Sequence, residues 1–311
     1  MFVRLLMVPD FRSSRKDRRP RMREGAPMTI PESVGVVGGG TMGAGIAHAF
    51  LVAGTARLTV VESDDERVAA ARSAVGTSLQ GAADRGKLPE GTTVEELLER
   101  LSVVVGAGEL PADAGLVVEA VPERIDLKQQ ILGDVAQRCP DAVLASNTSS
   151  LSVAAIGEQL PADRVIGMHF FNPVPAQKLV ELIRTPQTSD DVVGTVRGWV
   201  ADLGKTPIVV DDSPGFATSR LGLVVGLEAI RMVEEGVASA EDIDTGMELG
   251  YRWPMGPLKL TDVVGLDVRL AIAEHLAGEL GERFTPPQLL RDKVERGELG
   301  RKSGHGFHLW D

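Results

Sequence analysis

Two polar residues, His169 and Glu181, interrupt apolar stretches near the middle of the chain. His169 lies near the end of the run at 165–171, and Glu181 divides the run at 179–183. A carboxylate flanked by apolar residues is costly to bury unless it is paired. If the two runs form a hairpin, Glu181 can hydrogen-bond one imidazole nitrogen and leave the other as a general base. Beside a nicotinamide, that base would take the proton of a secondary alcohol while its carbon loses hydride. The alternative is a structural core histidine with an unrelated edge glutamate.

A strand, a glycine-rich turn and a helix are predicted between residues 34 and 50. The turn reads GGGTMG from Gly38, which is a G-x-G-x-x-G pattern. Its first glycine allows the tight turn, its second lets a pyrophosphate approach the backbone, and its third lets helix and strand pack closely. Phosphates would bind the N–H groups of the helix N-terminus. We therefore predict cofactor contacts from Gly38, Gly40, Thr41, Met42 and Gly43.

Glu62 ends a second predicted strand, 24 residues after Gly38. A carboxylate at this position accepts hydrogen bonds from the adenosine ribose hydroxyls. Residues 63–65 add two carboxylates, and no basic residue occurs before Arg67, so a 2′-phosphate would meet negative charge. The pattern therefore predicts NAD and not NADP. The alternative is an ordinary strand–helix turn with a surface glutamate.

Strand-like and helix-like patterns alternate up to residue 212. Apolar runs at 57–61, 101–105, 116–121 and 142–145 are separated by helical patterns or polar turns, which is typical of a doubly wound, Rossmann-type parallel sheet. Ligands bind beyond the carboxyl ends of such strands, and this rule brings Ser146 and Glu123 beside the cofactor. From residue 213 onward we expect helices, including 266–280 and one that begins at Thr285-Pro286. The predicted units are thus 30–212, an NAD-binding α/β domain that carries the dyad, and 213–311, a helical domain.

Composition narrows the class of protein. The chain is 43% hydrophobic and 25% charged, with a net charge of −11, which is ordinary for a globular protein and unfavourable for nucleic-acid binding. A single cysteine, Cys139, excludes an internal disulfide framework and predicts a cytoplasmic location. No apolar run reaches the roughly 18 residues of a membrane span. We predict no metal site, and we interpret the remaining histidines as structural or surface residues; they are His48, His275, His305 and His308.

The first residues differ from the rest. Residues 1–27 carry eight Arg or Lys against three acidic residues, a net charge of +5, which leaves −16 for residues 28–311. We expect residues 1–29 to be a disordered basic extension, with Met28 as a plausible true start. The alternatives are a targeting peptide, although the charges follow the apolar stretch in the wrong order for a secretory signal, or a nucleic-acid-binding arm.

Six motifs identify a family. The segments GGGTMGAGIAHAF, SNTSSLSV, GMHFFNPVPAQKLVELI, DSPGF, EDIDTGMELGYRWPMGP and GRKSGHGF resemble those of the L-3-hydroxyacyl-CoA dehydrogenases, in particular the short bacterial 3-hydroxybutyryl-CoA dehydrogenases. The resemblance covers the chain from about residue 34 to its end. It implies a Rossmann-type domain, a helical domain for substrate binding and dimerisation, NAD as cofactor, an acyl-CoA substrate and a homodimer. It also implies that His169 is the base and that Glu181, 12 residues later, is its partner.

The resemblance implies further roles. Ser146 and Asn172 would hydrogen-bond the reacting oxygen or the nicotinamide, Glu123 and Lys128 would contact the cofactor, and the coenzyme A moiety would lie near Ser78, Arg85 and Lys87. One departure concerns Ser219, which stands where many members have an asparagine that helps to bind substrate. Ser219 therefore leaves open a related dehydrogenase that acts on a carrier-protein thioester or a small hydroxy acid. A non-catalytic dinucleotide-binding protein is a more remote alternative, because His169, Glu181, Ser146 and Asn172 are all present.

Overall fold

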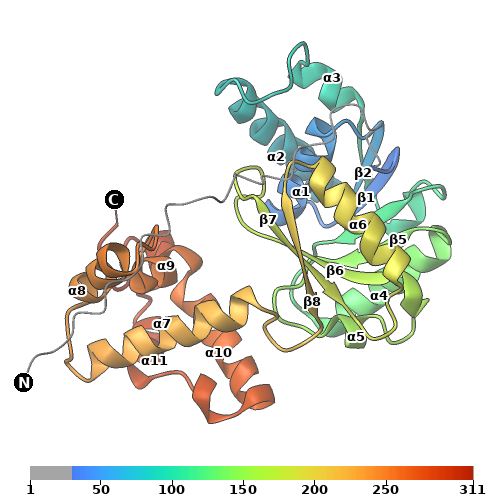
Figure 1. Cartoon of the computed structure of the whole chain (residues 1–311). Helices are drawn as coiled ribbons and strands as arrows, with labels where there is room; N and C mark the ends of the chain where they lie inside the picture. Colours follow the sequence, from blue (N-terminus) through green and yellow to red (C-terminus); the bar gives the residue numbers. More distant parts are fainter. Residues whose placement is uncertain (1–29, 311) are drawn as a thin grey trace, which may run out of the picture.

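The computed structural model describes residues 30–310, so the basic extension predicted over residues 1–29 lies outside the described part. The chain first builds an eight-stranded sheet flanked by helices and then a group of helices beside it (Figure 1). The strands are β1 (Ser33–Val37), β2 (Arg57–Glu62), β3 (Leu101–Val105), β4 (Leu116–Glu119), β5 (Val143–Ser146), β6 (Val165–Phe170), β7 (Leu179–Arg184) and β8 (Thr206–Asp211). Their order in the sheet is β3-β2-β1-β4-β5-β6-β7-β8.

Helices cover both faces of this sheet. They are α1 (Thr41–Val52), α2 (Asp65–Ala83), α3 (Val94–Glu99), α4 (Ile125–Arg138), α5 (Val153–Ile156) and α6 (Asp190–Asp202). Phe50 of α1, Val75 of α2 and Trp199 of α6 belong to one apolar core. Leu132 of α4 and Ile156 of α5 belong to a second core. Every residue of β1, β4, β5 and β6 is buried, as expected for parallel strands covered on both faces. The predicted Rossmann-type fold is confirmed.

The strand direction changes after β6. The first six strands are parallel, whereas β7 pairs antiparallel with β6 and then parallel with β8. The hairpin expected from the two apolar runs is therefore present. Its register places His169 directly opposite Glu181, and the connecting loop carries Asn172.

The remaining helices pack on one another. They are α7 (Thr218–Glu234), α8 (Ala240–Thr245), α9 (Pro257–Val264), α10 (Leu266–Leu280) and α11 (Gln288–Glu295), around a core that includes Leu223, Leu258 and Leu276. The expected helix at 266–280 is present, but the expected start at Thr285-Pro286 was wrong. Helix α11 begins at Gln288, after Pro287, because a proline disfavours the helical conformation in the residue before it. Within residues 30–310, none of the helices combines the length and apolar character needed to cross a membrane.

Candidate active site

His169 and Glu181 are in direct contact inside the sheet. His169 Nδ1 lies 2.8 Å from Glu181 Oε2, and the two residues are 7% and 0% exposed. Because a carboxylate only accepts, Nδ1 carries the proton and Nε2 of the neutral ring keeps its lone pair. The ring centroids of Phe171 and Phe216 lie 4.5 Å and 5.9 Å from the centroid of the imidazole ring. The arrangement leaves Nε2 as a base in largely apolar surroundings.

Glu181 is also held by the first turn of α7. Thr218 Oγ1 donates to Glu181 Oε2 over 2.6 Å, and the N–H groups of Thr218 and Ala217 donate to Oε1 over 3.0 Å and 3.3 Å. Burial acts to raise the pKa of Glu181, but the hydrogen bonds from His169 and Thr218 outweigh burial and lower it. The carboxylate is therefore ionised at neutral pH and stabilises positive charge on the imidazole.

Ser146 is one end of a buried chain of polar contacts. Its hydroxyl donates to Glu119 Oε2 over 2.6 Å, and Glu119 Oε1 accepts from Lys128 Nζ and the Val121 N–H, each over 2.7 Å. Lys128 also contacts the Val121 carbonyl oxygen and a carboxylate oxygen of Glu123, each at 3.2 Å. Since Lys128 is 1% exposed and its three donors are used, it orients the two carboxylates and offers no free ammonium to a ligand.

Glu123 joins the loops that follow β4 and β5. Its Oε1 accepts from Thr148 Oγ1 over 2.6 Å and from the N–H groups of Ser149 and Ser150 over 2.9 Å and 3.2 Å. Burial acts to raise the pKa of Glu123, but Lys128 and these donors outweigh burial and lower it. An ionised Glu123 thus holds the loop after Ser146 in place beside the carboxyl ends of β4 and β5.

The glycine turn borders a cavity of about 680 Å³ that is also lined by Glu62 and residues 120–122. Gly38 has φ +94°, and a Cβ on Gly43 would lie 1.7 Å from the Gly38 carbonyl oxygen, so both positions require glycine on internal grounds. A Cβ on Gly40 would meet no atom of residues 30–310 within 4 Å. The space beside Gly40 is therefore open to a ligand, as a closely approaching pyrophosphate would need.

Three further expected cofactor residues, Glu62, Thr41 and Met42, line the same cavity, whereas Glu123, Lys128, Ser146 and Asn172 are not on its described lining. Glu62 Oε1 accepts from the Gly39 N–H over 2.6 Å, which fixes the carboxylate at the end of β2. Thr41 and Met42 form the first turn of α1, and no side chain among residues 30–310 caps that helix. Its free N–H groups can therefore bind an anion. The donors, the carboxylate and the open space beside Gly40 fit a dinucleotide.

The residues expected near coenzyme A border a second cavity, of about 730 Å³. Ser78 faces it from α2, and Arg85 and Lys87 lie on the turn that follows. His48 of α1 lines it too, with Nδ1 2.9 Å from Ser78 Oγ. His48 thus has a side-chain partner in a ligand-sized cavity, which its spacing in the sequence did not reveal.

Asn172 and Ser219 form no side-chain hydrogen bond with any residue between 30 and 310. Asn172 is exposed on the loop three residues after His169, and Ser219 is half-buried in the first turn of α7, next to Thr218. Neither side chain is therefore occupied by a partner among residues 30–310.

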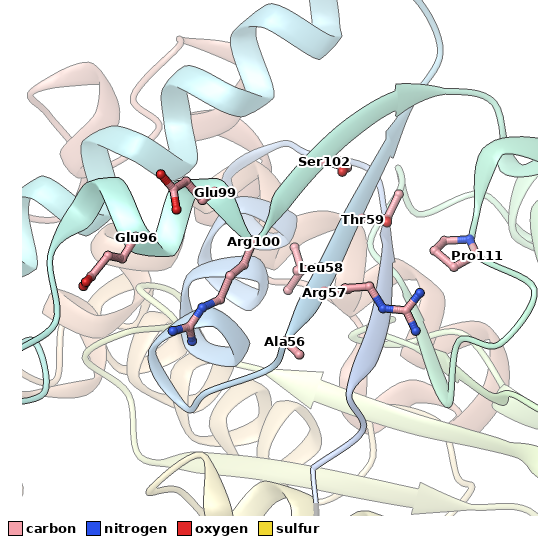
Figure 2. Close-up of a pocket in the computed structure, with 9 residues that line it drawn as sticks. All are labelled: Ala56, Arg57, Leu58, Thr59, Glu96, Glu99, Arg100, Ser102 and Pro111. Atoms are coloured by element: carbon pink, nitrogen blue, oxygen red, sulfur yellow. The ribbon is translucent and has the colours of Figure 1, made fainter.

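A third pocket lies at the opposite ends of the strands from the glycine turn. Figure 2 shows it, about 350 Å³ in volume, with the side chains of Arg57, Arg100 and Glu96 around it. Arg57 begins β2 whereas Glu62 ends it, so this pocket borders the amino ends of the strands. Ligands of doubly wound sheets bind at the other edge. In the described part of the chain no group of three or more His, Cys, Asp or Glu residues could hold a metal ion.

Two residues of the site escaped the sequence prediction. Glu119 ends an apolar run in the same way that Glu181 interrupts one, so the same signal could have identified it. Thr218 had no such signal, because it lies far from Glu181 in the sequence and meets it only through the packing of α7 against β7.

Comparison with known proteins relates both parts of the chain to one family. Residues 33–213 match the NAD-binding domain of 3-hydroxyacyl-CoA dehydrogenase, and residues 215–310 match its C-terminal domain. A probable 3-hydroxybutyryl-CoA dehydrogenase of Deinococcus radiodurans is 42% identical over 280 residues, which are 89% of this chain and 99% of the relative. The 3-hydroxybutyryl-CoA dehydrogenase of Mycobacterium tuberculosis is 41% identical over 286 residues, 90% and 98% of the two chains. The crystal structure of (S)-3-hydroxybutyryl-CoA dehydrogenase from Ralstonia eutropha superposes with a TM-score of 0.84 at 40% identity, covering 91% of this chain and all of that one.

Proposed function

The chain belongs to the 3-hydroxyacyl-CoA dehydrogenase family, and on that premise we propose that it catalyses the reversible, NAD-dependent oxidation of an L-3-hydroxyacyl-CoA to the 3-ketoacyl-CoA. The observation that carries the proposal is the 2.8 Å contact between His169 Nδ1 and Glu181 Oε2. We infer a short acyl chain, such as 3-hydroxybutyryl, from the relatives' names.

His169 is the general base of the proposed reaction. Its Nε2 accepts the proton of the substrate's C3 hydroxyl in the oxidative direction and returns it in the reductive direction. NAD, when bound, supplies the hydride acceptor. Glu181 keeps the proton on Nδ1 and stabilises the imidazolium that forms, which is the role of a carboxylate partner. Ser146 and Asn172 are the proposed hydrogen-bonding groups for the reacting oxygen or the nicotinamide.

The proposed cofactor site runs along the carboxyl ends of the strands. Gly38, Gly40 and Gly43 shape the turn, Thr41 and Met42 offer N–H groups for the pyrophosphate, and Glu62 accepts from the ribose hydroxyls; Glu123 completes the site, with Lys128 as the residue that orients it. The proposed coenzyme A contacts are Ser78, Arg85 and Lys87. Ser219 would touch the substrate near the reacting carbon, through a water molecule or a closer approach than an asparagine requires.

We propose two units and a homodimer. The units are residues 30–212 for the cofactor and the dyad, and 213–311 for substrate binding and dimerisation. The helical unit, residues 213–311, carries exposed apolar side chains on α7, α9 and α10 and beside α8. Among them are Leu221 (65% exposed), Leu249 (78%) and Tyr251 (75%). Because exposed apolar patches mark interaction sites, these side chains support a dimer. A cytoplasmic location is proposed from the single, buried cysteine.

The test is the loss of NADH absorbance on addition of acetoacetyl-CoA, with NADPH in parallel and with free acetoacetate and an acetoacetyl carrier protein as alternative substrates. We expect turnover that prefers NADH and the CoA thioester. We also expect His169→Ala to lower kcat by at least about a hundredfold, the usual contribution of general acid–base catalysis. Full turnover by His169→Ala would remove the assigned base, and a preference for the free acid or the carrier protein would replace the proposed substrate.

A further inference from the structure

The cavity beside His48 is bounded by four segments of the α/β domain. His48 and Val52 come from α1, Ser78 from α2, Pro173 from the loop between β6 and β7, and Lys205 from the turn before β8. The loop that carries Pro173 also carries Asn172 and joins the strands of His169 and Glu181. The cavity therefore borders the loop that joins the two strands of the dyad.

Positive charge dominates its walls. Arg85, Lys87 and Lys205 face the cavity, and Asp202 is the one carboxylate on its described lining. Neither Arg85 nor Lys87 pairs with a carboxylate of residues 30–310. Lys205 Nζ donates to the carbonyl oxygens of Val174 and Gln177 over 2.6 Å and 2.7 Å. Both partners are uncharged, so the ammonium group of Lys205 has no counterion among residues 30–310. A phosphorylated ligand would supply the missing negative charge.

His48 is the neutral member of this group. It is 5% exposed, and burial together with Lys205 and Arg85 lowers its pKa from 6.5 to about 4. The ring therefore has one N–H and one lone pair at neutral pH. The 2.9 Å contact with Ser78 Oγ can run in either direction: Ser78 donates to Nδ1, or the Nδ1–H donates to Ser78.

A phosphate selects between these two directions. A serine hydroxyl has one proton, and a phosphate oxygen can only accept. If Ser78 gives its proton to His48, it presents a lone pair to the phosphate and repels it. If His48 gives the Nδ1 proton to Ser78 Oγ, the serine proton is free to point at the phosphate.

We propose that His48 is a positioning residue that donates its Nδ1–H to Ser78 and so turns the Ser78 hydroxyl toward a phosphate of the nucleotide end of coenzyme A. The proposal rests on the proposed function for the substrate and extends it to a residue that contacts no reacting atom. The ligand class is a phosphorylated adenosine, held by Ser78 and the three cations.

The experiment compares two substrates that differ only in the handle. Acetoacetyl-CoA carries the phosphorylated nucleotide, and the acetoacetyl thioester of N-acetylcysteamine lacks it. The variants are His48→Leu, which has no donor, His48→Gln, whose amide can donate to Ser78, Ser78→Ala and the double variant His48→Leu with Ser78→Ala. His305→Gln is the matched control, since His305 is exposed and lies outside the site.

We expect His48→Leu to lower kcat/KM for acetoacetyl-CoA about tenfold, the scale of a hydrogen bond to a charged group, and to change that of the short thioester less than about twofold on the same reasoning. His48→Gln should recover most of the loss. The double variant should be no worse than Ser78→Ala, because both changes remove one contact. Equal losses on both thioesters, or losses that multiply in the double variant, would overturn the role of His48 and mark it as a structural residue.

A binding measurement separates this proposal from the proposed function. Titration calorimetry with adenosine 3′,5′-bisphosphate requires no turnover. We expect wild type to bind it and His48→Leu to bind about tenfold more weakly, with far-UV circular dichroism unchanged. Equal affinity of the two proteins, or no binding to either, would refute the phosphate site. Lack of turnover of either thioester by wild type would refute the proposed function instead.

Discussion

Glu119→Gln should destabilise the protein although it replaces one atom. Glu119 is fully buried and faces Lys128, which is 1% exposed, over 2.7 Å. Removal of one partner of a buried ion pair costs about 3–5 kcal/mol, because the other charge is left buried. Lys128 would keep Glu123 at 3.2 Å, so we expect the lower end, about 3 kcal/mol. At roughly 2 °C per kcal/mol, the low end of the range because this chain is long, Tm should fall by about 6 °C.

The assay is urea denaturation followed by far-UV circular dichroism, in which a lower midpoint at constant slope reports lost stability. Lys128→Met and the double variant Glu119→Gln with Lys128→Met complete a cycle, and the double variant should lose less than the two single losses together. Glu109→Gln is the control, because Glu109 is exposed. A loss below about 1 kcal/mol for Glu119→Gln, or additive losses in the cycle, would refute the reasoning that Lys128 depends on this carboxylate.

Three further outcomes follow from the same structure. Gly40→Ala should weaken NAD binding at unchanged Tm, because its Cβ would meet no atom of the described residues within 4 Å. Gly43→Ala should instead lower Tm, because its Cβ would lie 1.7 Å from a carbonyl oxygen. Equal NAD affinity of Gly40→Ala and wild type in calorimetry would contradict the open ligand space. Arg269→Met should raise Tm, because Arg269 is 7% exposed, its Nε has no hydrogen-bond partner in the described part of the chain, and burial lowers its pKa to about 10. A lower Tm, or a dimer that dissociates in sedimentation, would mean that a second chain supplies its partner. The lowered pKa of Glu181 adds stability that is present above its ordinary value of 4.5 and is lost as pH falls through the folded-state pKa. The difference in Tm between wild type and Glu181→Gln should therefore narrow below about pH 4.5. A difference that widens there would mean that the pKa of Glu181 is raised in the folded state.

The sequence could predict what depends on short patterns. The glycine turn, the alternation of strands and helices, and the hairpin with His169 opposite Glu181 all follow from residue patterns within single elements or between consecutive ones. It could not predict contacts that depend on packing across the chain. Thr218 reaches Glu181 from 37 residues away, and Ser78 reaches His48 across two helices. Helix α9 was missed for another reason. Its start, Gly256-Pro257, carries a known signal for a first helical turn, but eight residues are too few for a clear apolar period.

The contacts of Glu181 explain why the dyad lies where the sheet meets the helices. A buried carboxylate opposite a histidine needs more than one donor to stay ionised. The sheet supplies His169, and the remaining donors come from Thr218 and Ala217, at the N-terminal end of α7. A helix N-terminus stabilises a negative charge. The first turn of α7 therefore stabilises the ionised form of Glu181, which the residues of β7 do not do. Phe216, two residues before α7, lies with its ring centroid 5.9 Å from that of the imidazole. Packing of the start of α7 against β7 therefore sets the ionisation of Glu181, and a change at Thr218 should alter it.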